Sequence, residues 1–202
     1  MVIHSVPMLK VSNREKILNE GLRVVHERGF AGASVRDIVQ AAGVPQGSFS
    51  NHFASKEAFG LEILERYLAR VHASIAATLL NESFAPIERL RAYLNDVEES
   101  LQRNDMRNGC LFGNFSAESS DNTESIRCRL KEIFTEVQTA LATCLRAAVA
   151  AGQAPADLDC EEMAGFVFSS LQGAILVSKA ERSPLPFQRF KNVILTRILR
   201  PA

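Results

Sequence analysis

The chain has 202 residues, of which 47% are hydrophobic and 23% are charged, and its 23 basic side chains balance 23 acidic ones. This length holds one large domain or a small domain joined to a medium one, and zero net charge argues against a protein coated in positive charge for nonspecific binding to nucleic acid. No uninterrupted apolar stretch approaches the roughly 18 residues of a membrane span, and residues 1–10 lack the features of a secretory signal, so we expect a cytoplasmic protein that crosses no membrane.

The front of the chain carries only a faint basic bias. Residues 1–60 hold 7 Lys and Arg against 5 Asp and Glu, which leaves 16 against 18 for the remainder. The four cysteines are widely spaced and form no CxxC pair, so we predict free thiols and no zinc site, metal or cofactor. They are Cys110, Cys128, Cys144 and Cys160.

Helical periodicity runs through the chain and strand alternation is almost absent, which predicts an all-α fold of about nine helices. The first helix is capped by Ser12 or Asn13 and stops at Gly29. A second helix of about two turns starts at Ser34, whose side chain forms a capping box with the acid three residues later, and stops at Gly43. Two short helices on either side of a glycine turn then form a helix-turn-helix.

The third helix lies within residues 44–53, where Pro45 suits a first turn and the segment allows only about two turns. Ser55 caps a long fourth helix from Lys56 to about Leu80. We therefore expect a helix-turn-helix domain over residues 1–55 and a larger helical domain over residues 56–202.

The larger domain contains five further predicted helices with clear breaks between them. Apolar spacing, the late loop at residues 152–157, the acidic cap before the eighth helix and the proline turn at residues 183–186 set their limits. The expected spans are Ile87 to Leu101, Cys110 to Ser119, Glu124 to Ala151, Asp159 to Lys179 and Phe187 to Leu199.

The strongest signal is the stretch from Ser34 to Glu57, which combines a capped helix, a glycine turn, a short helix and a newly capped long helix. Its sequence resembles the DNA-binding domain of TetR-type repressors, over about a quarter of the chain. The matching segments are Ala33–Ile38, Ala42–Val44, Gly47–Phe49 and His52–Ala58. The resemblance implies that the third helix enters the major groove of double-stranded DNA while the first helix and the start of the fourth brace the phosphate backbone.

Short polar side chains in the third helix suit hydrogen bonding to base edges or phosphates, and Gly47 allows close approach of the backbone. Many relatives carry an aromatic residue where this chain has Ser50, so affinity or operator choice differs here. Phe49 and Phe53 are expected in the core. The alternative reading of residues 44–53 is a packed surface turn. The predicted DNA-binding residues are Ser34, Arg36, Gln46, Gly47, Ser48, Ser50, Asn51, His52 and Lys56.

In repressors of this kind the later helices form a ligand cavity and a dimer interface. Cys110 stands at the start of a short helix beside Arg107, and both features lower a thiol pKa. The segment resembles a subgroup that responds to electrophiles or small unsaturated compounds, which implies effector or thiol sensing by Cys110, Phe112 and Phe115. The alternative is that Cys110 is a small buried packing residue.

We expect a homodimer through the last two helices, because the eighth helix carries a stripe rich in small residues that permits close packing. The stripe consists of Met163, Phe166, Val167, Ser170, Leu171, Ala174 and Ile175.

Two other classes of protein compete with a ligand-responsive repressor. An enzyme lacks support, because the sequence holds no HExxH, phosphate loop or nucleophile elbow. A helical interaction module explains the amphipathic helices but not the polar third helix. We therefore predict a non-enzymatic regulator that is released from a palindromic operator when a small molecule or a thiol modification moves the fourth helix.

Overall fold

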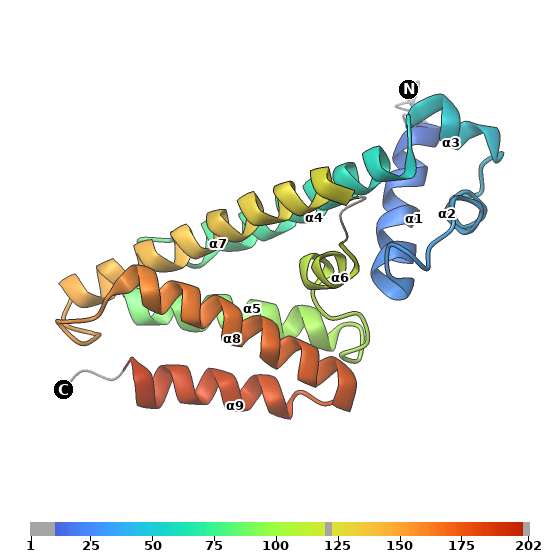
Figure 1. Ribbon diagram of the computed structural model, residues 1–202. Helices are drawn as coiled ribbons and strands as arrows, with labels where there is room; N and C mark the ends of the chain where they lie inside the picture. The colour runs from blue at the N-terminus through green and yellow to red at the C-terminus, as the bar shows by residue number, and fades with distance from the viewer. Residues whose placement is uncertain (1–10, 120–122, 200–202) are drawn as a thin grey trace, which may run out of the picture. The chain divides into compact units, whose positions relative to one another are not determined.

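The computed structural model describes residues 11–119 and 123–199; residues 1–10, which we predict to be no secretory signal, lie outside this part of the chain. The described residues form nine α-helices and no strand, which confirms the predicted all-α fold (Figure 1). The helices are α1 Asn13–Arg28, α2 Val35–Ala41, α3 Gly47–His52, α4 Lys56–Ala77, α5 Pro86–Gln102, α6 Leu111–Glu118, α7 Glu124–Ala150, α8 Cys160–Glu181 and α9 Leu185–Val193.

The chain separates into two compact units, the first ending at Ile63 and the second beginning at Leu64. Helix α4 is continuous across this division, so its first two turns belong to the first unit and the rest to the second. The predicted boundary between residues 55 and 56 falls at the start of α4, two turns earlier.

Helix ends follow the local signals in the sequence. The Ser12 side chain accepts a hydrogen bond from the backbone N–H of Glu15 at 3.2 Å, and Asp159 caps α8 in the same way. Gly29 ends α1 with a φ of 80°, a conformation that glycine adopts without strain. At the end of α4, the Leu80 amide donates to the carbonyl of Ile75, five residues earlier, and not to the carbonyl four residues earlier as in an α-helix. The helix therefore stops at Ala77 and does not reach the predicted end near Leu80.

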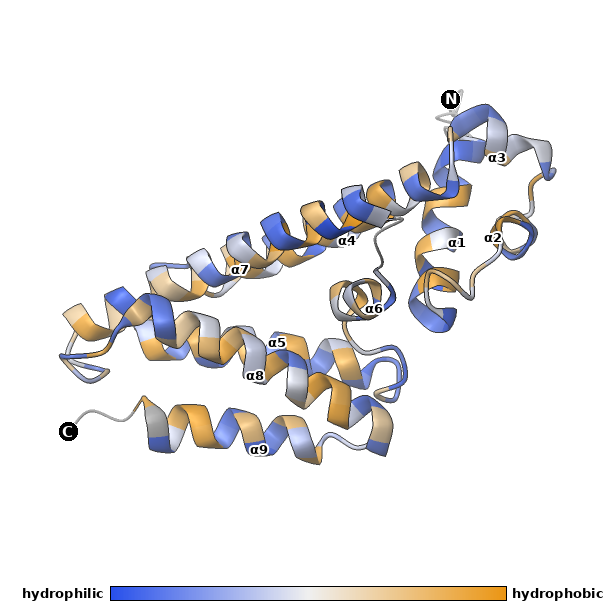
Figure 2. Ribbon diagram, viewed as in Figure 1, coloured by the Kyte–Doolittle hydropathy of each residue, from blue (hydrophilic) through white to orange (hydrophobic). Residues whose placement is uncertain are grey.

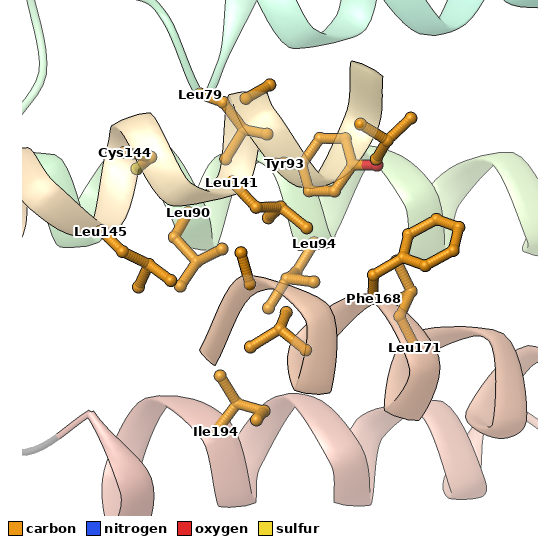
Figure 3. Packing of buried hydrophobic residues seen from close by; sticks show 14 of the residues in the cluster. Leu79, Leu90, Tyr93, Leu94, Leu141, Cys144, Leu145, Phe168, Leu171 and Ile194 are labelled. Atoms are coloured by element: carbon orange, nitrogen blue, oxygen red, sulfur yellow. The ribbon is translucent and has the colours of Figure 1, made fainter. Parts of the chain in front are cut away.

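The core of the second unit lies among α5, α7, α8 and α9 (Figure 3). Leu90 and Leu94 of α5 and Leu141 of α7 are at most 1% exposed and belong to the same buried cluster as Leu171 of α8. After α9, a π-helical turn over Ile194–Ile198 places Ile194 in the same core. Burial of this many large side chains is the main stabilising contribution to the unit.

The residues of the predicted α8 stripe divide between the core and the surface. Val167, Leu171 and Ile175 face the core, whereas Phe166 is 50% exposed. Helical periodicity predicted an apolar face on α8, and the core of the second unit covers part of that face.

Helix α8 is apolar along much of its length (Figure 2). Among the described residues it is the one helix long and apolar enough to cross a membrane by length and composition. Its outward side carries apolar and small residues at helical spacing. The exposed members of this outer α8 stripe are Phe166, Ser169, Gly173, Leu176, Val177 and Ala180.

Candidate DNA interface and effector site

Local hydrogen bonds fix the start of α2, and a glycine turn follows its end. The Ser34 hydroxyl donates to the Asp37 carboxylate at 2.5 Å, and the backbone N–H of each residue bonds the other's side chain at 3.1 Å. These hydrogen bonds from Ser34 hold the pKa of Asp37 below its usual range. Gly43 follows with a φ of 63°, which allows the chain to reverse before α3.

Three aromatic rings form the base on which α3 rests. Phe49 and Phe53 lie with ring centroids 5.1 Å apart, and Phe59 from the start of α4 lies 5.3 and 5.1 Å from them. All three are at most 5% exposed, which confirms that Phe49 and Phe53 are core residues. Gly21 of α1 makes room for this aromatic base, because a Cβ there would lie 2.4 Å from Cζ of Phe59.

The opposite side of α3 carries exposed polar groups. Gln46, Gly47, Ser50 and Asn51 are exposed, and the Ser50 hydroxyl donates to the Gly47 carbonyl at 3.1 Å. Ser48 differs, since its side chain lies inward with the residue only 8% exposed. Ser48 is therefore not available to a duplex in this conformation, because it occupies the core-facing side of a two-turn helix.

The remaining predicted DNA residues lie around α3 in the first unit. Arg36 on α2 and His52 at the end of α3 are exposed. The Lys56 ammonium lies 4.8 Å from the centroid of the Phe30 ring and 3.4 Å from the Ala31 carbonyl oxygen. A cation over an aromatic face is held electrostatically, so the start of α4 presents an ordered positive charge.

Sequence reasoning missed Arg14 on α1. Its guanidinium lies 5.6 Å from the Phe53 ring centroid and pairs with Glu62 of α4. The pairing ties α1 to the first turns of α4 within the first unit. No short motif predicts it, because the two partners are 48 residues apart.

In the second unit, Cys110 occupies the N-cap position of α6 without a capping hydrogen bond from its side chain. The backbone N–H groups of Phe112 and Gly113 and the side chains of Tyr67 and Gln172 surround the thiol, and each acts to lower its pKa. Burial nevertheless raises the pKa of the Cys110 thiol, and these donors only oppose that effect. The prediction of a lowered pKa is therefore wrong in this conformation, because desolvation disfavours the thiolate.

The two predicted phenylalanines lie close to Cys110 in the chain and are buried. Phe112 is 3% and Phe115 2% exposed, and the Tyr67 ring meets Phe112 edge-on with centroids 4.8 Å apart. Tyr67 belongs to α4 and Gln172 to α8, so α4, α6 and α8 meet at this thiol. Burial also raises the pKa of Tyr67.

The loop before α6 is fixed from α8. Gly109 has a φ of 67°, and a Cβ there would lie 3.0 Å from Cδ of Lys179. The Lys179 ammonium donates to Asn114 at 3.1 Å, and Asn114 in turn donates to the Asn108 carbonyl at 2.9 Å. The start of α6, and with it Cys110, is thus held in place by α8.

Other clusters add no chemistry to this site. Within residues 11–119 and 123–199, no three His, Cys, Asp or Glu side chains gather as metal ligands. The four cysteines are free thiols. Residues on the surface of α7 between Arg127 and Glu136 line an open hollow, which includes none of the predicted effector residues.

A helix-turn-helix with an outward polar helix, continued by a long helix into an all-helical second unit, is the arrangement of a DNA-binding regulator. Residues 17–63 match the family described as bacterial regulatory proteins, tetR family, and residues 86–194 match the tetracyclin repressor-like C-terminal domain. The chain belongs to the TetR family.

Named relatives agree over nearly the full length. The chain is 36% identical over 192 residues to the HTH-type transcriptional repressor DhaR of Mycobacterium sp. strain GP1, covering 95% of both chains. The crystal structure of the regulatory protein TetR from Rhodobacter sphaeroides has a TM-score of 0.83 and 32% identity, covering 90% of this chain and 96% of that one. The reduced form of E. coli NemR has a TM-score of 0.82 and 28% identity, covering 95% and 100%.

Proposed function

We propose that the protein is a cytoplasmic, ligand-responsive transcriptional repressor that binds a palindromic operator as a homodimer. The observation that carries this proposal is the exposed polar side of α3 above a buried aromatic base. Gln46, Ser50, Asn51 and His52 reach base edges or phosphates, and Gly47 lets the backbone approach the duplex. Ser34, Arg36 and Lys56 brace the phosphates on either side.

Selection of bound genomic fragments at low salt tests DNA recognition. We expect enrichment of palindromes whose half-sites are one or more helical turns apart, with affinity that falls steeply as salt rises. Gln46→Ala should weaken binding of the enriched duplex by about 10- to 100-fold, the size of one lost base contact. Gln102→Ala, at an exposed position in the second unit, is the matched control. A protein that retains no duplex in low salt contradicts the proposal.

The effector site of the proposed repressor centres on Cys110, Phe112 and Phe115. A small molecule bound there, or an adduct on the Cys110 sulfur, competes for the space that Tyr67 occupies and displaces its hydroxyl from the thiol. Because Tyr67 belongs to α4, this shifts the population toward a state in which the two recognition helices no longer match the half-site spacing.

N-ethylmaleimide is a suitable probe of the thiol mechanism. We expect it to release the wild-type protein and a Cys128→Ser variant from the enriched duplex, but not a Cys110→Ser variant. Cys128 is the matched control because its thiol is exposed on α7. Equal release of the Cys110→Ser variant would assign this residue to packing alone and leave reversible ligand binding as the mechanism.

The dimer is proposed to form through α8 and α9. The outer α8 stripe has residues 166, 169, 173, 176 and 180 at alternating spacings of three and four, the pattern of a helix–helix seam. On α9, Leu185 is 62% and Val193 40% exposed, which extends the apolar surface. An exposed apolar surface of this kind is typical of a protein–protein interface.

Analytical ultracentrifugation at micromolar concentration tests this interface. We expect a dimer for the wild-type protein and a monomer for Leu176→Arg, which places a charge at a position that is 68% exposed in the single chain. Unchanged helical content by circular dichroism shows that the variant folds. A wild-type monomer, or a dimeric Leu176→Arg variant, contradicts the assignment.

A further inference from the structure

Helices α4 and α7 are linked by a connected series of charged side chains, the α4–α7 ladder. The Arg129 guanidinium bonds both carboxylate oxygens of Glu65, at 2.6 and 3.1 Å. It also contacts Glu132 at 2.9 Å and Glu136 at 3.1 Å, and Glu136 bonds Nε2 of His72 at 2.8 Å. The ladder therefore runs Glu65, Arg129, Glu136, His72, with two contacts from one helix to the other.

The two cross-helix contacts share one register. Glu65 and Arg129 are 64 residues apart in the chain, and His72 and Glu136 are also 64 apart. The two helices thus run parallel here, without slippage between the first contact and the second. Seven residues of helix advance by about 10.5 Å, so the contacts lie about two turns apart on the same side of each helix.

Arg129 is the member of the ladder best suited to fix this register. Its side chain is 24% exposed, whereas the carboxylate partners range from 38% to 65%. Hydrogen bonds from Arg129 lower the pKa of Glu65, and the bond to Glu65 is the largest cause of the raised pKa of Arg129. Isolated surface ion pairs contribute little, but bidentate geometry and a shared network raise the contribution.

Movement of α4 along α7 breaks the ladder as a whole. A shift of one helical turn, about 5.4 Å, exceeds the reach of both cross-helix contacts at once. The ladder therefore stabilises one axial position of α4 on α7, and both cross-helix contacts are lost together when α4 moves by one turn. Apolar contacts between parallel helices tolerate sliding better, because they are not directional.

We propose that Arg129 is a positioning residue that holds α4 on α7 in the axial register competent to bind the operator, and that release from DNA requires the ladder to break. This inference rests on the repressor function proposed above. It adds that the strength of the ladder sets how readily the protein leaves the operator. The proposal also makes the α4–α7 ladder a second element that controls DNA binding, in addition to the Cys110 thiol.

The test compares Arg129→Met, Glu65→Gln and the double variant with the wild-type protein. Methionine keeps a long unbranched side chain and removes the charge. Arg91→Met is the matched control, since Arg91 pairs with Glu88 on its own helix and both are about half exposed. Two quantities are measured: affinity for the enriched genomic duplex, and hydrogen exchange of the α4 amides in residues 64–77.

We expect Arg129→Met to weaken duplex binding about fivefold and to accelerate exchange in α4, while Arg91→Met changes neither. The double variant should be no weaker than Arg129→Met, because both substitutions break the same contact. Independent, additive losses, or an Arg129→Met variant with wild-type affinity and exchange, overturn the proposal.

The two proposals fail separately. If the wild-type protein binds no duplex, the repressor function fails, and so does the operator role of the ladder. Exchange in α4 then still decides whether Arg129 fixes the register: unchanged exchange refutes that as well. If the wild-type protein binds DNA and the ladder variants have the same affinity and exchange as the wild type, the proposal for the ladder fails and the repressor function stands.

Discussion

Gly21→Ala is expected to weaken the first unit even though alanine favours helices. The added Cβ would lie 2.4 Å from Cζ and 3.1 Å from Cε2 of Phe59, and 3.2 Å from Cγ2 of Ile38. Ordinary contact begins near 3.4 Å, so the Phe59 ring must move by about 1 Å. That ring is fully buried and is bounded by two other aromatic rings. Overpacking costs about 1–3 kcal/mol, and the helix-propensity gain of about 1 kcal/mol offsets part of it. Because the Phe59 ring has no free space to move into, we expect a cost near the upper end of that range and a net loss of about 2 kcal/mol.

The composition of the chain lets this loss be assigned to one unit. The protein has no tryptophan, and its two tyrosines, Tyr67 and Tyr93, belong to the second unit. Urea unfolding followed by circular dichroism reports both units, whereas tyrosine fluorescence reports the second. Gly21→Ala should lower the midpoint seen by circular dichroism and leave the fluorescence midpoint in place. Unchanged or higher stability by circular dichroism would refute the steric argument.

Gly47→Ala is the matched comparison, because its added Cβ meets nothing within 4 Å. We expect it to stabilise α3 by about 0.5–1 kcal/mol and to weaken duplex binding, measured by urea unfolding and titration; tighter binding would contradict close backbone approach. Glu98→Gln should cost about 2–3 kcal/mol in urea, since Glu98 is buried and bonds Lys191 and Gln188. Burial raises the pKa of Glu98, but these bonds outweigh it and lower the pKa below 4.5. Wild-type stability should therefore fall as pH drops below 4.5 through that lower pKa, and a variant with the same acid dependence would refute this origin. Tyr67→Phe should slow alkylation of Cys110 by N-ethylmaleimide at pH 8 about threefold, because one donor to the thiolate is lost; an unchanged rate would remove Tyr67 from the site.

Local signals predicted the helices well because their physical causes lie within a few residues. Ser12 and Ser34 accept bonds from amides three positions later, and Gly43 turns the chain through a conformation that other residues avoid. The helix-turn-helix and most of its exposed polar residues followed from these signals. Ser48 did not, because which side of a two-turn helix is covered depends on the aromatic residues beneath it.

The remaining features depend on contacts between distant parts of the chain. The pKa of Cys110 was predicted in the wrong direction, because the arginine and helix start beside it are visible in the sequence and its burial is not. Glu98 reads as an ordinary surface carboxylate on α5 until Lys191, 93 residues later, is placed against it. The predicted α8 stripe combined core residues such as Leu171 with the exposed Phe166, because both lie at apolar helical spacing.

The constant offset of 64 residues between α4 and α7 also restricts which changes in length the chain tolerates. One residue inserted between Arg129 and Glu136 would rotate the following carboxylate by about 100° and carry it away from His72. The same holds for an insertion between Glu65 and His72. Natural variants of this chain should therefore gain and lose residues in the connections between helices, such as residues 151–159, and keep these two stretches of equal length.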